Sequence, residues 1–189
     1  MNIIKRVAVF CGSSMGSDPA YRKSCVELAG LLTRQATGLV YGGGKIGLMG
    51  VLADEMLRLG GEVIGVIPRK LVDIEVVHTG LTKLHIVNSM HERKARMMEL
   101  SHAFIIMPGG IGTLDEFFDV LTWKQLGYHS KNIGILNVES YFDPLVSLLK
   151  TITEKGFIAR NFTDSLIISS SPSEILEKLG LDKIQPLQG

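Results

Sequence analysis

The sequence predicts an α/β fold in which helices cover both faces of a doubly wound parallel sheet. Short apolar runs alternate along the chain with amphipathic segments of helix length, and this alternation is typical of β-α-β units. The runs are apolar at nearly every position, as expected of strands that are buried on both sides. With 189 residues, 46% of them hydrophobic, the chain can bury one sizeable core. We therefore expect residues 1–189 to form a single domain.

Seven apolar runs are the predicted strands. We expect the strand order 3-2-1-4-5 in the sheet, which would place the loops after the fourth and fifth strands side by side. In chain order the predicted strands are residues 7–11, 39–41, 62–67, 84–87, 103–107, 133–137 and 166–168.

Residues typical of helix caps predict where several helices begin and end. Asp18 directly before Pro19 predicts an N-cap followed by a proline in the first turn. The glycine pair at 60–61 predicts the end of a helix that begins near Gly47. Residues 171–174 read Ser-Pro-Ser-Glu, which is a capping box with proline at the first helical position. The segments predicted to lack regular structure are residues 68–80, a loop near the site, and residues 184–189, a frayed tail.

Charge and cysteine content exclude several classes of protein. Lys and Arg number 20 and Asp and Glu 19, so the net charge of +1 gives no broad field to attract nucleic acid or an anionic membrane. Cys11 and Cys25 are too few for a disulfide framework and are not spaced as a metal site. We find neither a run of ~20 apolar residues nor a signal-peptide pattern. We therefore expect a cytoplasmic protein without nucleic-acid or membrane partners.

Three predicted strands end in glycine-rich turns, each followed by a helix. Residues 11–14 read CGSS, residues 41–44 read YGGG and residues 108–113 read PGGIGT. Glycine lets the backbone approach a ligand, and the free amides of a first helical turn favour an anion, so a phosphate is the natural ligand. Glycines that only allow tight turns are the alternative for any one loop. The residues expected to bind substrate here are Gly12, Ser13, Gly43, Gly44, Pro108, Gly109, Gly110, Gly112 and Thr113.

Two common nucleotide signatures do not fit. The glycines within residues 42–47 have G-x-G-x-x-G spacing, but a dinucleotide fingerprint also needs an acidic residue about 20 positions on, at the end of the next strand. Glu62 stands instead at the start of that strand. A P-loop is excluded because Ile46, rather than serine or threonine, follows Lys45.

A basic pair follows the fourth predicted strand. Residues 88–94 read NSMHERK, so Arg93 and Lys94 fall in the first turns of the next helix. If the loops after the fourth and fifth strands are neighbours, one of these cations comes close to Glu116. The alternative is an exposed basic pair that binds nearby glutamates on its own helix.

Glu116 allows two interpretations. Thr113 to Glu116 matches the S/T-x-x-E capping box, in which the carboxylate only caps the helix. However, phosphate capture alone requires no carboxylate beside a cation. Such a set suits cleavage of a nucleotide's N-glycosidic bond, because a carboxylate can stabilise the growing positive charge on ribose and orient a water. Asp115, about 100° further round the helix, is expected to point elsewhere.

Several roles remain open for Arg93. It could polarise the departing base, orient Glu116 or hold phosphate, but a guanidinium is a poor proton donor. The reaction requires no metal, and the five histidines show no paired ligand spacing. We therefore expect neither a metal nor a cofactor.

At these residues the sequence resembles the LOG (Lonely Guy) family of nucleotide phosphoribohydrolases. The family signature P-G-G-x-G-T-x-x-E is present as residues 108–116, and the resemblance continues through CGSS, YGGG, MHERK and TWKQLGYHSKNIGILN over roughly residues 5–160. It implies a Rossmann-like fold and hydrolysis of a cytokinin riboside 5′-monophosphate, or of AMP, to free base and ribose 5-phosphate. Relatives are often labelled lysine decarboxylases, but no lysine here stands in a context typical of pyridoxal binding.

The resemblance also implies residue roles and an assembly. Arg93 and Glu116 match the catalytic pair of the family. Members form dimers or larger assemblies through helices near the site, which suits an apolar stripe on residues 114–126; a core-facing helix is the alternative. The stripe consists of Leu114, Phe117, Phe118, Leu121 and Leu126. The substrate-binding residues implied beyond the glycine-rich turns are Glu75, Met90, Lys94 and Thr122.

One rival function belongs to a different class. The chain could bind a nucleotide or a phosphorylated cofactor without catalysis, with the loops holding phosphate and Glu116 acting as a helix cap. The base preference is also open, between adenine and a modified cytokinin base.

Overall fold

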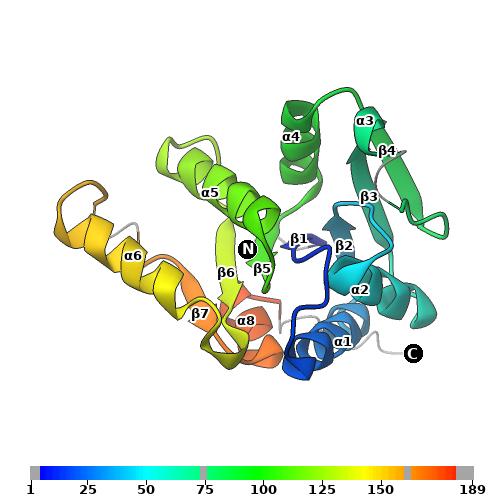
Figure 1. The fold of residues 1–189 in the computed structure, drawn as a ribbon, viewed down its shortest axis with the longest axis horizontal. Coiled ribbons are helices and arrows are strands. Elements are labelled where there is room, and N and C mark those ends of the chain that lie inside the picture. Colours follow the sequence, from blue (N-terminus) through cyan, green and yellow to red (C-terminus); the bar gives the residue numbers. More distant parts are fainter. Residues whose placement is uncertain (1–4, 73–75, 160–162, 182–189) are drawn as a thin grey trace.

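The computed structural model describes residues 5–72, 76–159 and 163–181, and it contains one parallel sheet between two layers of helices (Figure 1). The fold class predicted from the sequence is therefore confirmed. The strands are β1 (Arg6–Phe10), β2 (Gly38–Tyr41), β3 (Val63–Pro68), β4 (Lys83–Val87), β5 (Ala103–Ile106), β6 (Asn132–Leu136) and β7 (Ile167–Ser169). The helices are α1 (Pro19–Arg34), α2 (Gly47–Arg58), α3 (Arg69–Val72), α4 (Met90–Leu100), α5 (Ile111–Gln125), the 3₁₀ turn η1 (Val138–Ser140), α6 (Asp143–Glu154) and α8 (Pro172–Leu179).

The strand order differs from the prediction. The sheet runs β4-β3-β2-β1-β5-β6-β7, so β4 lies at the edge and β5 takes the place beside β1. The composition of the two strands explains this. β4 reads KLHIV and exposes Lys83 and Ile86, which only an edge tolerates, whereas β5 reads AFII and is buried throughout. The winding of the chain reverses between β1 and β5, where open sheets of this kind bind ligands.

Alternate residues of the central strands enter two separate cores. In β1, Val7 and Val9 face one side of the sheet, while Ala8 and Phe10 face the other. The first side packs against α1, α2 and α8, and the second against α4, α5 and α6, as Figure 1 shows. Both faces of the central strands are therefore closed to solvent, and a ligand can reach these strands only at their ends.

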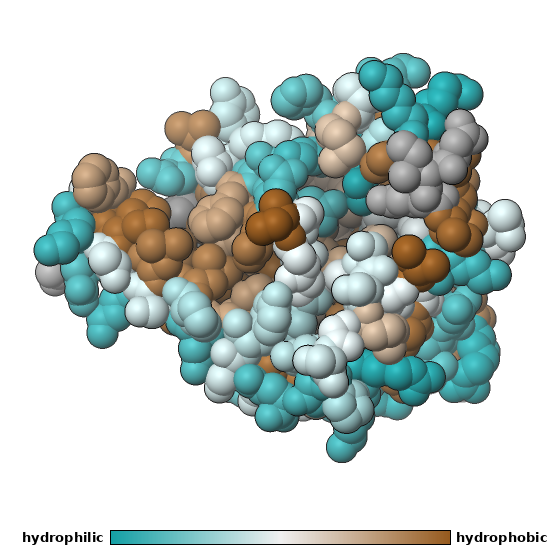
Figure 2. All heavy atoms as spheres, viewed as in Figure 1, coloured by the Kyte–Doolittle hydropathy of each residue, from teal (hydrophilic) through white to brown (hydrophobic). Residues whose placement is uncertain are grey.

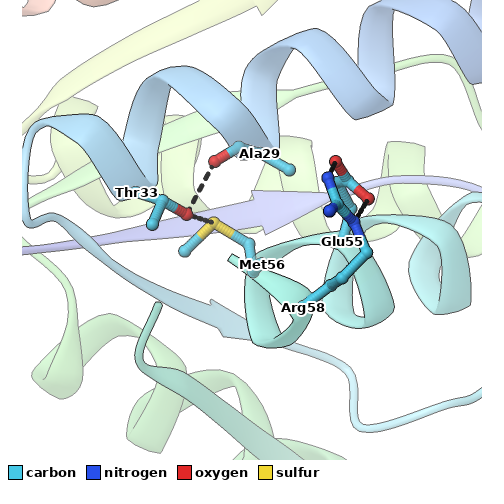
Figure 3. Close-up of polar contacts among 5 residues, drawn as sticks. All are labelled: Ala29, Thr33, Glu55, Met56 and Arg58. Carbon is cyan, nitrogen blue, oxygen red and sulfur yellow. Dashed lines mark hydrogen bonds and ion pairs between the residues drawn. The ribbon is translucent and has the colours of Figure 1, made fainter. Parts of the chain in front are cut away.

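α1 and α2 pack against each other on the first of these faces (Figure 3). Thr33 of α1 donates its hydroxyl proton to the carbonyl of Ala29 at 2.9 Å, and the same oxygen lies 3.3 Å from the sulfur of Met56 in α2. Arg58 and Glu55 form an ion pair along α2 at 2.7 Å, with Arg58 mostly exposed. Such a surface pair contributes little, so apolar burial holds the two helices together.

The predicted N-caps and helix end are confirmed, but the capping box at residues 171–174 is only half formed. The carboxylate of Asp18 accepts the N–H of Ala20 at 2.8 Å, with proline at the start of α1. α2 ends at Arg58, and Gly60 has a left-handed φ of 81°. Ser171 accepts the N–H of Glu174 at 3.4 Å at the start of α8. The N–H of Ser171 donates to Ser169, and the carboxylate of Glu174 binds Ser169 and Lys178 instead.

The segment 68–80 is only partly irregular. Pro68 is the last residue of β3, and residues 69–72 form the short helix α3, so the loop prediction is wrong for these residues. Glu75 and the predicted tail 184–189 lie outside the described residues. No helix in the described part of the chain has the length and apolar character needed to cross a membrane.

Candidate active site

The three glycine-rich turns meet beside β1 and β5, where the winding of the chain reverses. Gly12 donates its N–H to the carbonyl of Pro108 at 3.0 Å and accepts the N–H of Met49 at 3.2 Å. A Cβ on Gly109 would lie 2.8 Å from the nitrogen of Gly12, and one on Gly47 would lie 2.2 Å from a carbonyl carbon of the first loop. The turns after β1, β2 and β5 therefore form one packed unit that depends on missing side chains.

α5 begins in the third of these turns and presents free amides. Gly110 is the N-cap, has no side-chain cap, and accepts the first intrahelical N–H from Leu114 at 3.2 Å. The N–H groups of a first turn lack intrahelical partners and carry the positive end of the helix dipole. A Cβ on Gly110 or Gly112 would meet no atom within 4 Å. The start of α5 is thus an open site for an anion.

Thr113 packs against Gly109 of this turn, and it is buried, with 4% of its surface exposed. Its Oγ1 lies 2.1 Å from the position that a Cβ on Gly109 would occupy. Because Gly110 is the N-cap, Thr113 is the third residue of α5 and Glu116 lies in the second turn. The capping-box interpretation is therefore wrong, since it requires the threonine at the N-cap.

α4 brings Arg93 to α5 across the sheet. Ser89 caps α4 by accepting the N–H of Glu92 at 3.1 Å, and the carboxylate of Glu92 accepts the N–H of Asn88 at 2.7 Å. From the edge strand β4, the helix packs over β3, β2 and β1 and contacts α5. Arg93 thus reaches Glu116 although the strands that precede the two helices are not neighbours.

Arg93 and Glu116 form a buried ion pair. Nη2 of Arg93 lies 3.3 Å from Oε1 of Glu116, and the side chains are 8% and 11% exposed. Nη2 also packs against Gly42, where a Cβ would lie 2.3 Å away. Nε of Arg93 is buried and has no hydrogen-bond partner among the described residues. A guanidinium so placed holds the carboxylate of Glu116 against the glycine-rich turn after β2.

Lys94 does not join this pair. Its Nζ lies 2.8 Å from Asp115 and also contacts Asp119, one turn further along α5. Burial lowers the pKa of Lys94, but the hydrogen bonds that its ammonium group donates to the two carboxylates outweigh this effect, so the pKa is raised. Lys94 therefore ties α4 to α5, and Asp115 pairs with Lys94 while Glu116 pairs with Arg93.

The loop after β2 binds the segment that follows α3. Gly43 accepts the N–H of His78 at 3.0 Å, and Gly44 pairs with Val77 in an antiparallel bridge. The contacts observed for Gly43 and Gly44 are therefore with this segment. Elsewhere among the predicted substrate-binding residues, Gly12 and Pro108 are buried, Ser13 is exposed, Met90 is 40% exposed at the start of α4, and Thr122 is exposed about 9 Å along α5 from Glu116.

Sequence reasoning missed two residues that shape the site. Gly42 belongs to the YGGG run, but nothing in the sequence indicated that Arg93 packs against it. Asp119 could have been found, because it stands four residues after Asp115 on the same helical face. In the ranges that the structure describes, no group of three His, Cys, Asp or Glu side chains could hold a metal ion.

We predict that Gly42→Ala lowers turnover by about tenfold or more without unfolding the protein. The new Cβ would displace Nη2 of Arg93, the end of a flexible side chain, rather than backbone, and a shift of about 1 Å in a positioning group costs up to about 100-fold. Steady-state kinetics and thermal melting measure the two effects. Gly30→Ala in α1 is the matched control, because its Cβ would make only ordinary contacts, at 3.7 Å with Arg34 and 4.0 Å with Leu59. Wild-type turnover in Gly42→Ala would contradict the position of Arg93.

Solved structures of low sequence identity share the fold. The molybdenum cofactor binding protein from the phototrophic bacterium Rippkaea orientalis matches with a TM-score of 0.70 and 20% identity, over 95% of this chain and 97% of that one. The Moco carrier protein from Chlamydomonas reinhardtii matches with a TM-score of 0.68 and 15% identity, over 93% and 94% of the two chains. These likenesses concern the fold alone.

Sequence comparison gives a closer relationship. A family model described as "Possible lysine decarboxylase" matches residues 49–179. The cytokinin riboside 5′-monophosphate phosphoribohydrolase LOG1 of Arabidopsis thaliana is 43% identical over 175 residues, which cover 93% of this chain and 82% of LOG1. The enzyme LOG of Oryza sativa subsp. japonica, which has the same activity in its name, is 42% identical over 93% of this chain and 72% of its own length. The chain therefore belongs to the LOG family, the family that this model describes.

Proposed function

We propose that the chain hydrolyses the N-glycosidic bond of a purine riboside 5′-monophosphate and releases the free base and ribose 5-phosphate. The observation that carries this proposal is the buried Arg93–Glu116 pair, which lies one helical turn beyond the free amides at the start of α5. The names of relatives at 42–43% identity support the same reaction.

In this proposal each part of the site has one task. The amides of the first turn of α5 bind the 5′-phosphate, so that the ribose extends toward Glu116 in the second turn. As the bond between the anomeric carbon and the base breaks, the carboxylate stabilises the positive charge on the ribose and orients a water. The water oxygen bonds to the anomeric carbon as the bond to the base breaks. The water loses one proton to Glu116 and the departing base takes up one proton, so the net change is the addition of one water. Arg93 holds Glu116 beside the ribose.

The description as a lysine decarboxylase fits the site poorly. A lysine that forms a Schiff base must lose its proton readily, which requires a lowered pKa. Lys94, the lysine beside the pair, instead has a raised pKa because Asp115 and Asp119 bind its ammonium group. A lysine in that state is a structural cation.

Two or more copies of the chain associate through α5 in this proposal. Phe117 and Leu121 of the predicted stripe are buried in the core, but Phe118 is 37% and Leu126 65% exposed. Figure 2 shows apolar side chains gathered over α5 and α6, and Leu148 of α6 is 50% exposed. A surface of this kind is typical of an interface. The buried half of the stripe thus faces the core, and the exposed half supports the proposed interface.

Leu126→Arg tests the interface. We expect the dissociation constant of the assembly to rise by about 30-fold or more, as for a central apolar interface residue worth about 2 kcal/mol. Light scattering after size-exclusion chromatography measures the mass at several concentrations. Leu59→Arg, a 39% exposed leucine after α2 on the opposite face, should leave the mass unchanged. A wild-type protein that runs as a 20.7 kDa monomer at every concentration would contradict the interface.

Incubation with AMP and with isopentenyl-adenosine monophosphate tests the proposed reaction. We expect free base and ribose 5-phosphate in equal amounts from at least one of the two, and the ratio of their kcat/KM values gives the base preference. Binding of both nucleotides without release of base would favour the rival function, a nucleotide or cofactor binder.

A further inference from the structure

Tyr141, which directly follows η1, contacts the anion-binding turn from outside. Its hydroxyl donates to the carbonyl oxygen of Gly109 at 2.6 Å. Because a peptide unit is planar and trans, fixing this carbonyl also fixes the N–H of Gly110, which points the opposite way. That N–H belongs to the N-cap of α5 and lies at the open start of the helix.

The peptide between Gly109 and Gly110 needs such a restraint. Glycine on both sides leaves its neighbouring dihedral angles freer than those of any other residue pair. A rotated peptide would turn the carbonyl oxygen of Gly109, instead of the N–H of Gly110, toward a bound anion, and the two negative groups would repel each other. A hydrogen-bond donor on the outer side opposes this rotation.

The turn that carries Tyr141 is held in an unfavourable backbone conformation. Glu139 and Ser140 have left-handed φ angles of 50° and 56°, and each such non-glycine residue costs on the order of 1 kcal/mol. Asn137 holds the turn: its Oδ1 accepts the N–H of Phe142 at 2.7 Å, and its Nδ2 donates to Asp143 at 2.7 Å. A strained backbone of this kind is kept only where surrounding contacts hold it in place, and it is often found beside functional sites.

Ring contacts also connect Tyr141 to the start of α1, which follows the first glycine-rich turn. Its ring packs edge-on against Tyr21 at 5.7 Å and against Phe142 at 4.9 Å between centroids. The ring of Tyr21 in turn lies where a Cβ on Gly16 would come within 2.8 Å. Tyr141 itself is 41% exposed, so it is not simply part of the core. Its position is therefore set by the turn after β5 and by the start of α1.

We propose that Tyr141 is a positioning residue for the phosphate site: its hydroxyl holds the peptide between Gly109 and Gly110 so that the N–H of Gly110 donates to the bound phosphate. The assignment rests on the proposed function for the identity of the substrate. The binding of inorganic phosphate at this turn tests it without any turnover.

Tyr141→Phe removes the hydroxyl and keeps the ring contacts. We expect the dissociation constant for inorganic phosphate, measured by calorimetry, to rise by about three- to tenfold, the worth of one hydrogen bond. KM for the nucleotide should rise by the same factor while kcat changes less than about twofold, because phosphate binding is shared by ground state and transition state. Tyr128→Phe, a 73% exposed tyrosine beyond α5, is the matched control and should match wild type.

Two results would overturn the proposal. The first is phosphate binding in Tyr141→Phe equal to that of wild type and of Tyr128→Phe. The second is a wild-type protein that binds neither phosphate nor AMP, because the N–H of Gly110 would then have no bound phosphate to which it could donate. Failure of the proposed reaction looks different: the wild type would bind phosphate, Tyr141→Phe would bind it more weakly, and neither would release base.

Discussion

Glu116→Gln is expected to lower turnover of the nucleotide by about 100-fold or more, the usual size of the effect of a general acid or base. Glutamine has nearly the same shape, and its oxygen can still accept a hydrogen bond from Nη2 of Arg93, 3.3 Å from the present carboxylate oxygen. It carries no charge, however, so it cannot stabilise a cationic ribose or take a proton from water. KM should change little, because the amides of α5 still bind the phosphate.

Glu99→Gln is the matched control for this substitution. Glu99 is an exposed glutamate of α4 that pairs with Arg96 at 3.0 Å, outside the site. We expect it to retain full activity. Steady-state kinetics of the two variants, with circular dichroism to check folding, measure the effect. Turnover of Glu116→Gln within about threefold of wild type would remove the carboxylate from the mechanism.

Arg93→Ala should produce a similar loss of turnover together with a loss of stability. Glu116 is 11% exposed, and breaking a buried ion pair by removing one partner costs about 3–5 kcal/mol because the other charge stays buried. The double variant Arg93→Ala/Glu116→Gln removes that charge. It should melt at a higher temperature than Arg93→Ala alone and yet remain inactive.

Thermal melting and kinetics on the same samples separate the two roles of Arg93. Arg96→Ala is the control, since Arg96 lies three residues away on α4 and is 41% exposed. It should be close to wild type in both measurements. An Arg93→Ala protein that keeps wild-type turnover would show that the guanidinium takes no part in the reaction.

The sequence was most informative about local structure. Apolar runs, caps and glycine-rich turns depend on neighbours in the chain, and the strands, the cap at Asp18 and the turns after β1, β2 and β5 follow from them. The strand order was predicted wrongly because pairing is a long-range choice. The composition of the two strands nevertheless indicated the correct order, because β4 contains charged residues and is partly exposed whereas β5 is apolar and buried.

Side-chain partners in the site were only partly predictable. Arg93 and Glu116 come together as predicted, but through a helix that crosses three strands rather than through adjacent loops. Lys94 was expected to bind the nucleotide, and that role stays a prediction, since in the structure it binds Asp115 and Asp119. Which of two consecutive cations faces which carboxylate depends on the rotation of α4 against α5, and no local pattern gives that rotation.

A structure of Glu116→Gln crystallised with AMP tests the central claim most directly, because the slow variant should retain intact substrate. We predict that the 5′-phosphate accepts hydrogen bonds from the amides at the start of α5, and that the anomeric carbon lies against residue 116, with Arg93 in contact with the nucleotide. A nucleotide bound with its phosphate elsewhere, or with its ribose turned away from residue 116, would contradict the account.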